Sequence, residues 1–247
     1  MIARPSLPRR IVAEALGTAL LVATVIGSGV MGERLAGGNV AIALLANTMA
    51  TGAGLAALIL TFGPISGAHF NPVVTLADAS QGGVAWRDVV PYLIGQIGGA
   101  FAGAACAHLM FSEPLFSASH HVRSGMAQIL SEFIATFGLL SVIWGCSRGR
   151  PSSTPFAVGA YISAAYWFTS STSFANPAVT LARAASDTFA GIRPMDVPGF
   201  IVGQLFGAAA STALFRWLMP TLPTVAARVV VPPSEEKYED DPVRLHS

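Results

Sequence analysis

The sequence predicts an all-α membrane protein with six transmembrane helices and two re-entrant half-helices, built as an inverted repeat. Three observations support this fold class. The chain of 247 residues is 53% hydrophobic and only 11% charged, about half the charged fraction of an average soluble domain. Its charged residues are clustered, so long apolar segments remain between them. Several motifs also occur twice in the same order.

Six segments are long and apolar enough to cross a membrane, which takes about 20 residues as a helix. We expect them near residues 11–31, 40–62, 89–110, 128–146, 154–170 and 197–219. The first segment follows arginines, as a secretory signal does, but its apolar run is too long for a cleaved one. We therefore expect it to be retained.

Arginine positions predict the orientation in the membrane. One side of the predicted spans is flanked by Arg4, Arg9, Arg10, Arg87, Arg148, Arg150 and Arg228, and the other by Arg34, Arg123 and Arg193. The positive-inside rule then places both termini in the cytoplasm. We expect a multi-pass protein of the cell (inner) membrane.

Composition excludes several other functions. The net charge of +1 comes without a basic patch, so no nucleic-acid partner is expected. Cys106 and Cys146 lie inside predicted spans without metal-like spacing, which favours apolar packing over a disulfide or a metal site. No catalytic constellation has a usable spacing, so we expect neither an enzyme nor a cofactor.

The motifs divide the chain into two repeats. RRIVAEALGTALL (9–21) resembles AQILSEFIATFGLL (127–140), which pairs Glu14 with Glu132, and YLIGQIGGA resembles FIVGQLFGA. With three spans in each half, the second half must be inverted relative to the first. The expected divisions are an N-terminal segment 1–10, a first repeat 11–110, a connecting loop 111–127, a second repeat 128–219 and a disordered, acidic and proline-rich cytoplasmic tail 220–247.

A third duplicated motif predicts the half-helices. NPVVTLAD (71–78) and NPAVTLAR (176–183) share six of their first seven residues. Asn is a strong N-cap and Pro is favoured at the first helical position, so each motif starts a helix, at 71–80 and 176–186. Two helix N-termini that meet near the midplane disfavour cations and offer hydrogen-bond donors to polar neutral molecules.

Glu14 and Glu132 lie about one turn inside apolar spans, where an unpaired carboxylate is costly. Re-entrant loops expose backbone N–H groups without helical acceptors. We therefore expect both carboxylates to anchor these loops. A proton relay is the alternative, but the pair is symmetric and no third ionisable group is in line.

The motifs AEALGT, SGAHFNPVVT, SEFIATFG, ANPAVT and GQLFGA resemble those of the aquaporin and aquaglyceroporin (major intrinsic protein) family, over about residues 9–219. The resemblance implies one pore per subunit and a homotetramer in the lipid bilayer. It also implies that two three-residue motifs, here called the asparagine boxes, lie in the pore. The first is Asn71, Pro72 and Val73, and the second is Asn176, Pro177 and Ala178. Backbone carbonyls of Gly67, Ala68 and His69, and of Ser171, Thr172 and Ser173, would line the path. His69 is then a loop-packing residue rather than a metal ligand.

The chain departs from the family pattern where Val179 stands in place of an arginine after the second box. By spacing, the other constriction positions are Thr51, Ala164 and Ser173, with Ser163 or Ala165 as alternatives to Ala164. All are small, which predicts a wide and mildly polar constriction. Valine at position 73, where the family has alanine, is a smaller departure.

Arg183 and Asp78 end the two duplicated motifs with opposite charges. Arg183 lies one turn beyond Val179 on the same face, so one interpretation places it in the outer vestibule, with Asp78 as its counterpart on the other side. We favour slightly the alternative, in which both reach solvent or cap their half-helices.

The expected function is a passive channel for small uncharged polar solutes. Glycerol and metalloid hydroxides such as arsenite, with some water, fit a wide constriction without arginine. The run FTSSTSFANPAVTLAR also resembles a bacterial subgroup associated with arsenic resistance. The alternatives are a channel mainly for water, a facilitator of small oxyanions and, less favoured, a coupled secondary transporter or a closed adhesive membrane protein.

Overall fold

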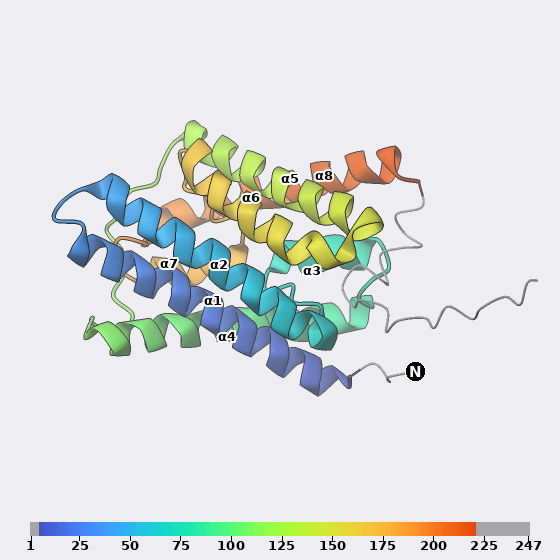
Figure 1. Cartoon of the computed structure of the whole chain (residues 1–247), viewed down its shortest axis with the longest axis horizontal. Coiled ribbons are helices and arrows are strands. Elements are labelled where there is room, and N and C mark those ends of the chain that lie inside the picture. The colour runs from blue at the N-terminus through green and yellow to red at the C-terminus, as the bar shows by residue number, and fades with distance from the viewer. Residues whose placement is uncertain (1–4, 221–247) are drawn as a thin grey trace, which may run out of the picture.

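Eight α-helices and two short 3₁₀ helices make up the described part of the chain, residues 5–220 of the computed structural model, without the side chains of residues 148 and 149 (Figure 1). They are α1 (Leu7–Leu35), α2 (Val40–Ser66), α3 (Pro72–Ser80), α4 (Trp86–Phe111), α5 (Met126–Gly149), η1 (Pro151–Ser153), α6 (Thr154–Phe168), α7 (Pro177–Ala184), η2 (Pro194–Asp196) and α8 (Val197–Leu218). Arg4, Arg228 and the predicted tail from residue 221 lie outside the described residues.

Five of these helices are long and apolar enough to cross a membrane: α1, α2, α4, α5 and α8. The sixth predicted span corresponds to α6, which has 15 residues and therefore rises only about 22 Å. The 3₁₀ helix η1 precedes it directly. The protein is thus an all-helical membrane protein, as predicted.

The helices form two halves with the same order of packing. In the first half α1 packs against α2 and α4, in the second α5 packs against α6 and α8, and α2 and α6 join the halves. The short helices α3 and α7 lie inside the bundle (Figure 1). Helix α3 lies toward the end that carries the N-terminus and the end of α8, here called the terminal end. Helix α7 lies toward the opposite, distal end.

Glycines allow the long helices to approach closely in both halves. A Cβ atom on Gly99 would fall on the carbonyl oxygen of Ala15, and Gly103 approaches α1 in the same way one turn later. In the second half, a Cβ on Gly203 would lie 2.6 Å from the carbonyl oxygen of Ile129. Small residues one turn apart therefore set the α1–α4 and α5–α8 distances.

Candidate functional site

The two half-helices begin at the asparagines of the duplicated motif. The Oδ1 atom of Asn71 accepts a hydrogen bond from the N–H of Val73 at 3.1 Å, and that of Asn176 accepts one from the N–H of Ala178 at 3.0 Å. A proline follows each asparagine at the first helical position, where it sacrifices no helical hydrogen bond. Both helices therefore start as the sequence predicts.

The same asparagines connect the two halves. The Nδ2 atom of Asn71 donates to the carbonyl of Ala175 at 2.7 Å, and that of Asn176 donates to the carbonyl of Phe70 at 2.8 Å. Because a side-chain amide has two N–H donors, one donor of each asparagine remains for the cavity that both residues line. The remaining box residues, Pro72, Val73, Pro177 and Ala178, are buried.

Glu14 anchors the first loop from the N-terminal third of α1. Its Oε1 accepts hydrogen bonds from Ser66 Oγ at 2.6 Å and from the N–H of His69 at 3.0 Å. Its Oε2 accepts from the N–H of Phe70 at 2.7 Å and from Gln96 Nε2 at 2.8 Å. The carboxylate is fully buried, and four donors satisfy it.

Glu132 repeats this arrangement in the second half. Its Oε1 accepts from Ser171 Oγ at 2.6 Å and from the N–H of Phe174 at 2.9 Å. Its Oε2 accepts from the N–H of Ala175 at 2.9 Å and from Gln204 Nε2 at 2.6 Å. Because the four donors occupy both oxygens, neither carboxylate is free to relay protons.

Both loops contain residues in the left-handed region of backbone conformation. The non-glycine residues with positive φ in these loops are Ala68, Phe70, Thr172, Ser173 and Ala175, with φ between 48° and 60°. Each such conformation costs about 1–3 kcal/mol and persists only when its surroundings enforce it. The hydrogen bonds to Glu14 and Glu132 hold these loops, together with those that Asn71 and Asn176 donate across to the opposite loop.

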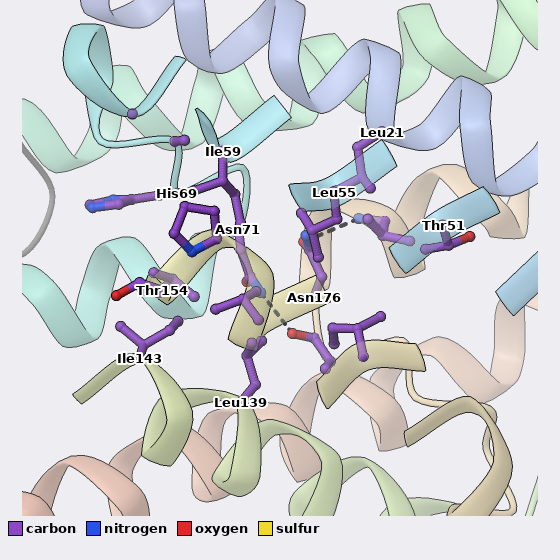
Figure 2. A pocket seen from close by; sticks show the side chains of 18 of the residues that line it. Leu21, Thr51, Leu55, Ile59, His69, Asn71, Leu139, Ile143, Thr154 and Asn176 are labelled. Atoms are coloured by element: carbon purple, nitrogen blue, oxygen red, sulfur yellow. Dashed lines mark hydrogen bonds between the residues drawn. The ribbon is translucent and has the colours of Figure 1, made fainter. Parts of the chain in front are cut away.

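A cavity of about 350 Å³ runs past the two asparagines. One stripe of its lining comes from α2, with Thr51, Leu55, Ile59 and Gly63, and another comes from α6, with Thr154, Val158, Ile162 and Tyr166. Both stripes advance four residues at a time, as one face of a helix does. Figure 2 shows Asn71 and Asn176 between His69 and Thr154 on one side and Thr51 on the other.

Three of the four predicted constriction residues line this cavity: Thr51, Ser173 and Val179. The prediction for Ala164 is wrong, because Ala164 is exposed on the outside of α6. It lies two residues, and so about 200° around the helix, from both Ile162 and Tyr166. Neither alternative, Ser163 or Ala165, is among the residues that line the cavity.

Tyr166 occupies the position in the cavity wall for which the sequence predicts the small residue Ala164. Its hydroxyl donates to Thr51 Oγ1 at 3.4 Å, and its side chain is buried in the cavity wall. The cavity is therefore narrower and more polar near Thr51 than four small residues would make it. The stripe at positions 154, 158, 162 and 166 is the sequence signal that identifies Tyr166.

The predicted backbone lining is only partly present. Gly67, Ala68 and His69 line the cavity, as does Ser173. Ser171 and Thr172 are not among the lining residues, and the carbonyl of Ser171 instead accepts a hydrogen bond from Arg123 Nη1 at 3.2 Å.

His69 packs within its own loop. Its Nδ1 lies 3.0 Å from Thr75 Oγ1, and its ring lies against that of Tyr92. Its Nε2 lies 3.8 Å from Asp78 Oδ2. Within residues 5–220, no three His, Cys, Asp or Glu side chains are grouped as metal ligands would be.

Arg183 and Asp78 are both buried, so the part of the favoured interpretation in which they reach solvent is wrong. Arg183 does lie in the last turn of its half-helix, where the capping alternative places it. Asp78 is 1% exposed and lies near His69. Arg183 is 2% exposed, lines the cavity, and donates from Nε to the carbonyl of Ala190. From hydropathy alone a charged side chain is expected to reach solvent. The sequence does not show that the fold brings the ring of Phe174 and the carbonyl of Ala190 to Arg183.

Comparisons with known proteins agree with this geometry. The family model described as "Major intrinsic protein" matches residues 1–175. The chain is 54% identical over 220 residues to "Aquaglyceroporin AqpS" of Rhizobium meliloti (strain 1021), covering 89% of this chain and 94% of the relative. It is 32% identical over 246 residues to "Probable aquaporin AqpM" of Archaeoglobus fulgidus, covering 86% and 98%. Its fold is similar to the X-ray structure of the aquaglyceroporin from Plasmodium falciparum, with a TM-score of 0.72 at 18% identity, covering 89% of this chain and 100% of that one.

Proposed function

Because the chain belongs to the major intrinsic protein family and is a channel for small neutral solutes, not an enzyme, we propose that it conducts mainly glycerol and metalloid hydroxides such as arsenite, with some water. The observation that carries this proposal is Val179. This residue lines the cavity in the first turn of α7, directly beyond the second asparagine box. A valine adds neither a long side chain nor a charge at this level.

The lining supports a solute that is partly apolar. The residues of α2 and α6 that face the middle of the cavity are aliphatic: Leu55, Ile59, Val158 and Ile162. The amides of Asn71 and Asn176 supply hydrogen-bond donors beside this aliphatic wall. A polyhydroxy or trihydroxy neutral molecule has several hydroxyl groups for these donors and a compact body for the aliphatic wall.

Stopped-flow light scattering on proteoliposomes tests the role of Val179. We expect the native chain to pass water, glycerol and arsenite. Val179→Arg is expected to keep most of the water permeability and to lower glycerol and arsenite permeability by about tenfold or more, because a long, hydrogen-bonding side chain narrows the path.

Val179→Leu is the matched control for the arginine variant. It adds bulk without charge and separates a steric effect from an electrostatic one. If native vesicles conduct only water, the assignment of Val179 as the widened position is wrong, and the chain is mainly a water channel.

Tyr166 is expected to set the upper size limit of the solute. Tyr166→Ala removes a buried ring from the cavity wall beside Thr51. We expect erythritol permeability to rise by roughly fivefold or more, while glycerol changes little, because discrimination by shape weakens as the cavity widens. Tyr166→Phe, which removes only the hydroxyl, is the control. Unchanged erythritol permeability in Tyr166→Ala would place the narrowest point elsewhere.

Facilitation of small oxyanions is a second candidate, and the burial of Arg183 in the cavity wall favours it. Nitrate flux in the same vesicles distinguishes this function from conduction of neutral solutes. A coupled secondary transporter has less support, because the residues at the meeting point of the half-helices are amides and not titratable groups.

We also propose that the subunits form homotetramers and that both termini are cytoplasmic. Large apolar side chains exposed on α2 and α6, among them Ile42, Met49 and Trp167, support burial against lipid or neighbouring subunits. Within residues 5–220, the terminal end carries more arginines than the distal end. The positive-inside rule therefore assigns the terminal end to the cytoplasm.

A further inference from the structure

Two buried arginines lie against the ring of Phe174, a residue that lines the cavity. The guanidinium carbon of Arg183 lies 3.3 Å from the ring centroid of Phe174, and that of Arg123 lies 5.1 Å from the same centroid. Arg183 comes from α7, whereas Arg123 comes from the loop between α4 and α5. The fold therefore brings both positive charges to one aromatic ring near the mouth of the cavity.

Neither arginine forms an ion pair with a carboxylate in the part of the chain that the structure describes. Arg183 donates to the carbonyl of Ala190, and Arg123 donates from Nε to the carbonyl of Gly191 at 2.8 Å. Burial of a charge is costly, and two like charges repel each other. Neutral donors would hold the same carbonyls at lower cost, so a purely structural role does not explain both charges.

The position of Arg183 relates it directly to Val179. The two residues are four apart on α7, one helical turn, and both line the cavity. Four residues advance the backbone by about 6 Å along the helix axis. Helical side chains lean toward the N-terminus of their helix, and the guanidinium of Arg183 reaches back to the ring of Phe174, which also lines the cavity.

We propose that Arg183, positioned by Phe174 and assisted by Arg123, is the cation barrier of this channel. Because Phe174 and the Ala190 carbonyl hold this charge against the cavity wall, the small residue at position 179 admits larger neutral solutes while the charge repels cations and hydronium. This inference rests on the proposed channel function.

The surrounding electrostatics agree with a positive mouth. His121, in the loop between α4 and α5, has its pKa lowered first by partial loss of hydration and then by the positive charges of Arg123 and Arg183. His121 is thus more often neutral at pH 7 than a free histidine, although the carboxylate of Asp187 acts in the opposite direction.

The decisive variant is Arg183→Gln, which keeps a donor for the Ala190 carbonyl and removes the charge. Glycerol permeability and proton conductance are measured in the same proteoliposomes, by light scattering and by an internal pH-sensitive dye under a potassium-valinomycin potential. Arg183→Lys keeps the charge. Arg34→Gln removes an exposed, ion-paired distal arginine as a matched control.

We expect Arg183→Gln to conduct glycerol at the native rate or faster and to leak protons about tenfold or more above the native channel, because removal of one nearby charge lowers the electrostatic barrier. Arg183→Lys and Arg34→Gln should leak like the native channel. Native proton conductance in a glycerol-conducting Arg183→Gln would overturn the inference. A native chain that passes no glycerol would instead overturn the proposed function.

A cysteine variant keeps the test decisive if the glutamine variant does not fold. In a background with Cys106 and Cys146 replaced by serine, Arg183→Cys is measured before and after reaction with aminoethyl methanethiosulfonate, which restores a positive charge. Restoration of the barrier supports the inference. An equal leak before and after complete modification overturns it.

Discussion

Glu132→Ala is expected to prevent the chain from accumulating as a folded membrane protein. The substitution leaves Ser171 Oγ, two backbone N–H groups and Gln204 Nε2 without their acceptor in a fully buried site. Each buried donor left unpaired costs about 1–3 kcal/mol, so the loss is at least about 3 kcal/mol. The measurements are the yield of monodisperse protein in size-exclusion chromatography and the midpoint of thermal unfolding in detergent.

Glu132→Gln is expected to be nearly as damaging. All four groups around the carboxylate act as donors to it, so the NH₂ of glutamine would face donors where an oxygen is needed. The control is Glu33→Ala, because Glu33 is exposed at the end of α1. A stable, conducting Glu132→Ala protein would show that other contacts hold the loop.

Gly99→Leu is expected to abolish the packing of α1 on α4. Even a Cβ atom at this position collides with the carbonyl oxygen of Ala15, which is backbone and has no rotamer to change. Overpacking commonly costs about 1–3 kcal/mol, and a leucine against backbone exceeds that range. We expect loss of the folded protein by the same two measurements.

The neighbouring residue Gly98 provides the matched control. A Cβ at Gly98 meets no atom within 4 Å. Gly98→Ala should therefore be neutral, or stabilising by about 0.5–1 kcal/mol, because alanine is the better helix former. Equal tolerance at positions 98 and 99 would contradict the close helix contact.

The sequence was sufficient to predict the arrangement of the fold because its motifs carry local chemistry. Asn followed by Pro starts a helix wherever it occurs in such a context, so the starts of α3 and α7 were predictable. Duplicated Glu14 and Glu132 indicated where the loops needed an acceptor. These interactions depend on residue type and short spacing, which a single sequence contains.

The cavity wall was harder to predict because it depends on helix rotation. Counting back from Asn176 to α6 crosses a loop in which three residues have positive φ, so the number of residues does not fix which face of α6 is turned inward. This is why spacing along the sequence points to Ala164 and not to Tyr166. The length of α6 and the burial of Arg183 and Arg123 likewise depend on tertiary contacts.

The reciprocal hydrogen bonds of Asn71 and Asn176 also constrain how the protein is made. Each bond joins residues more than a hundred positions apart, with separations of 104 and 106 residues. Ribosomes add about 5–20 residues per second, so roughly 5–20 s pass between synthesis of the first re-entrant loop and synthesis of the second. During that interval Glu14, itself held by Gln96, accepts hydrogen bonds from the backbone N–H groups of the loop within the bilayer. The carboxylate of the first half therefore lets that half be inserted by the translocon before the second half has been made.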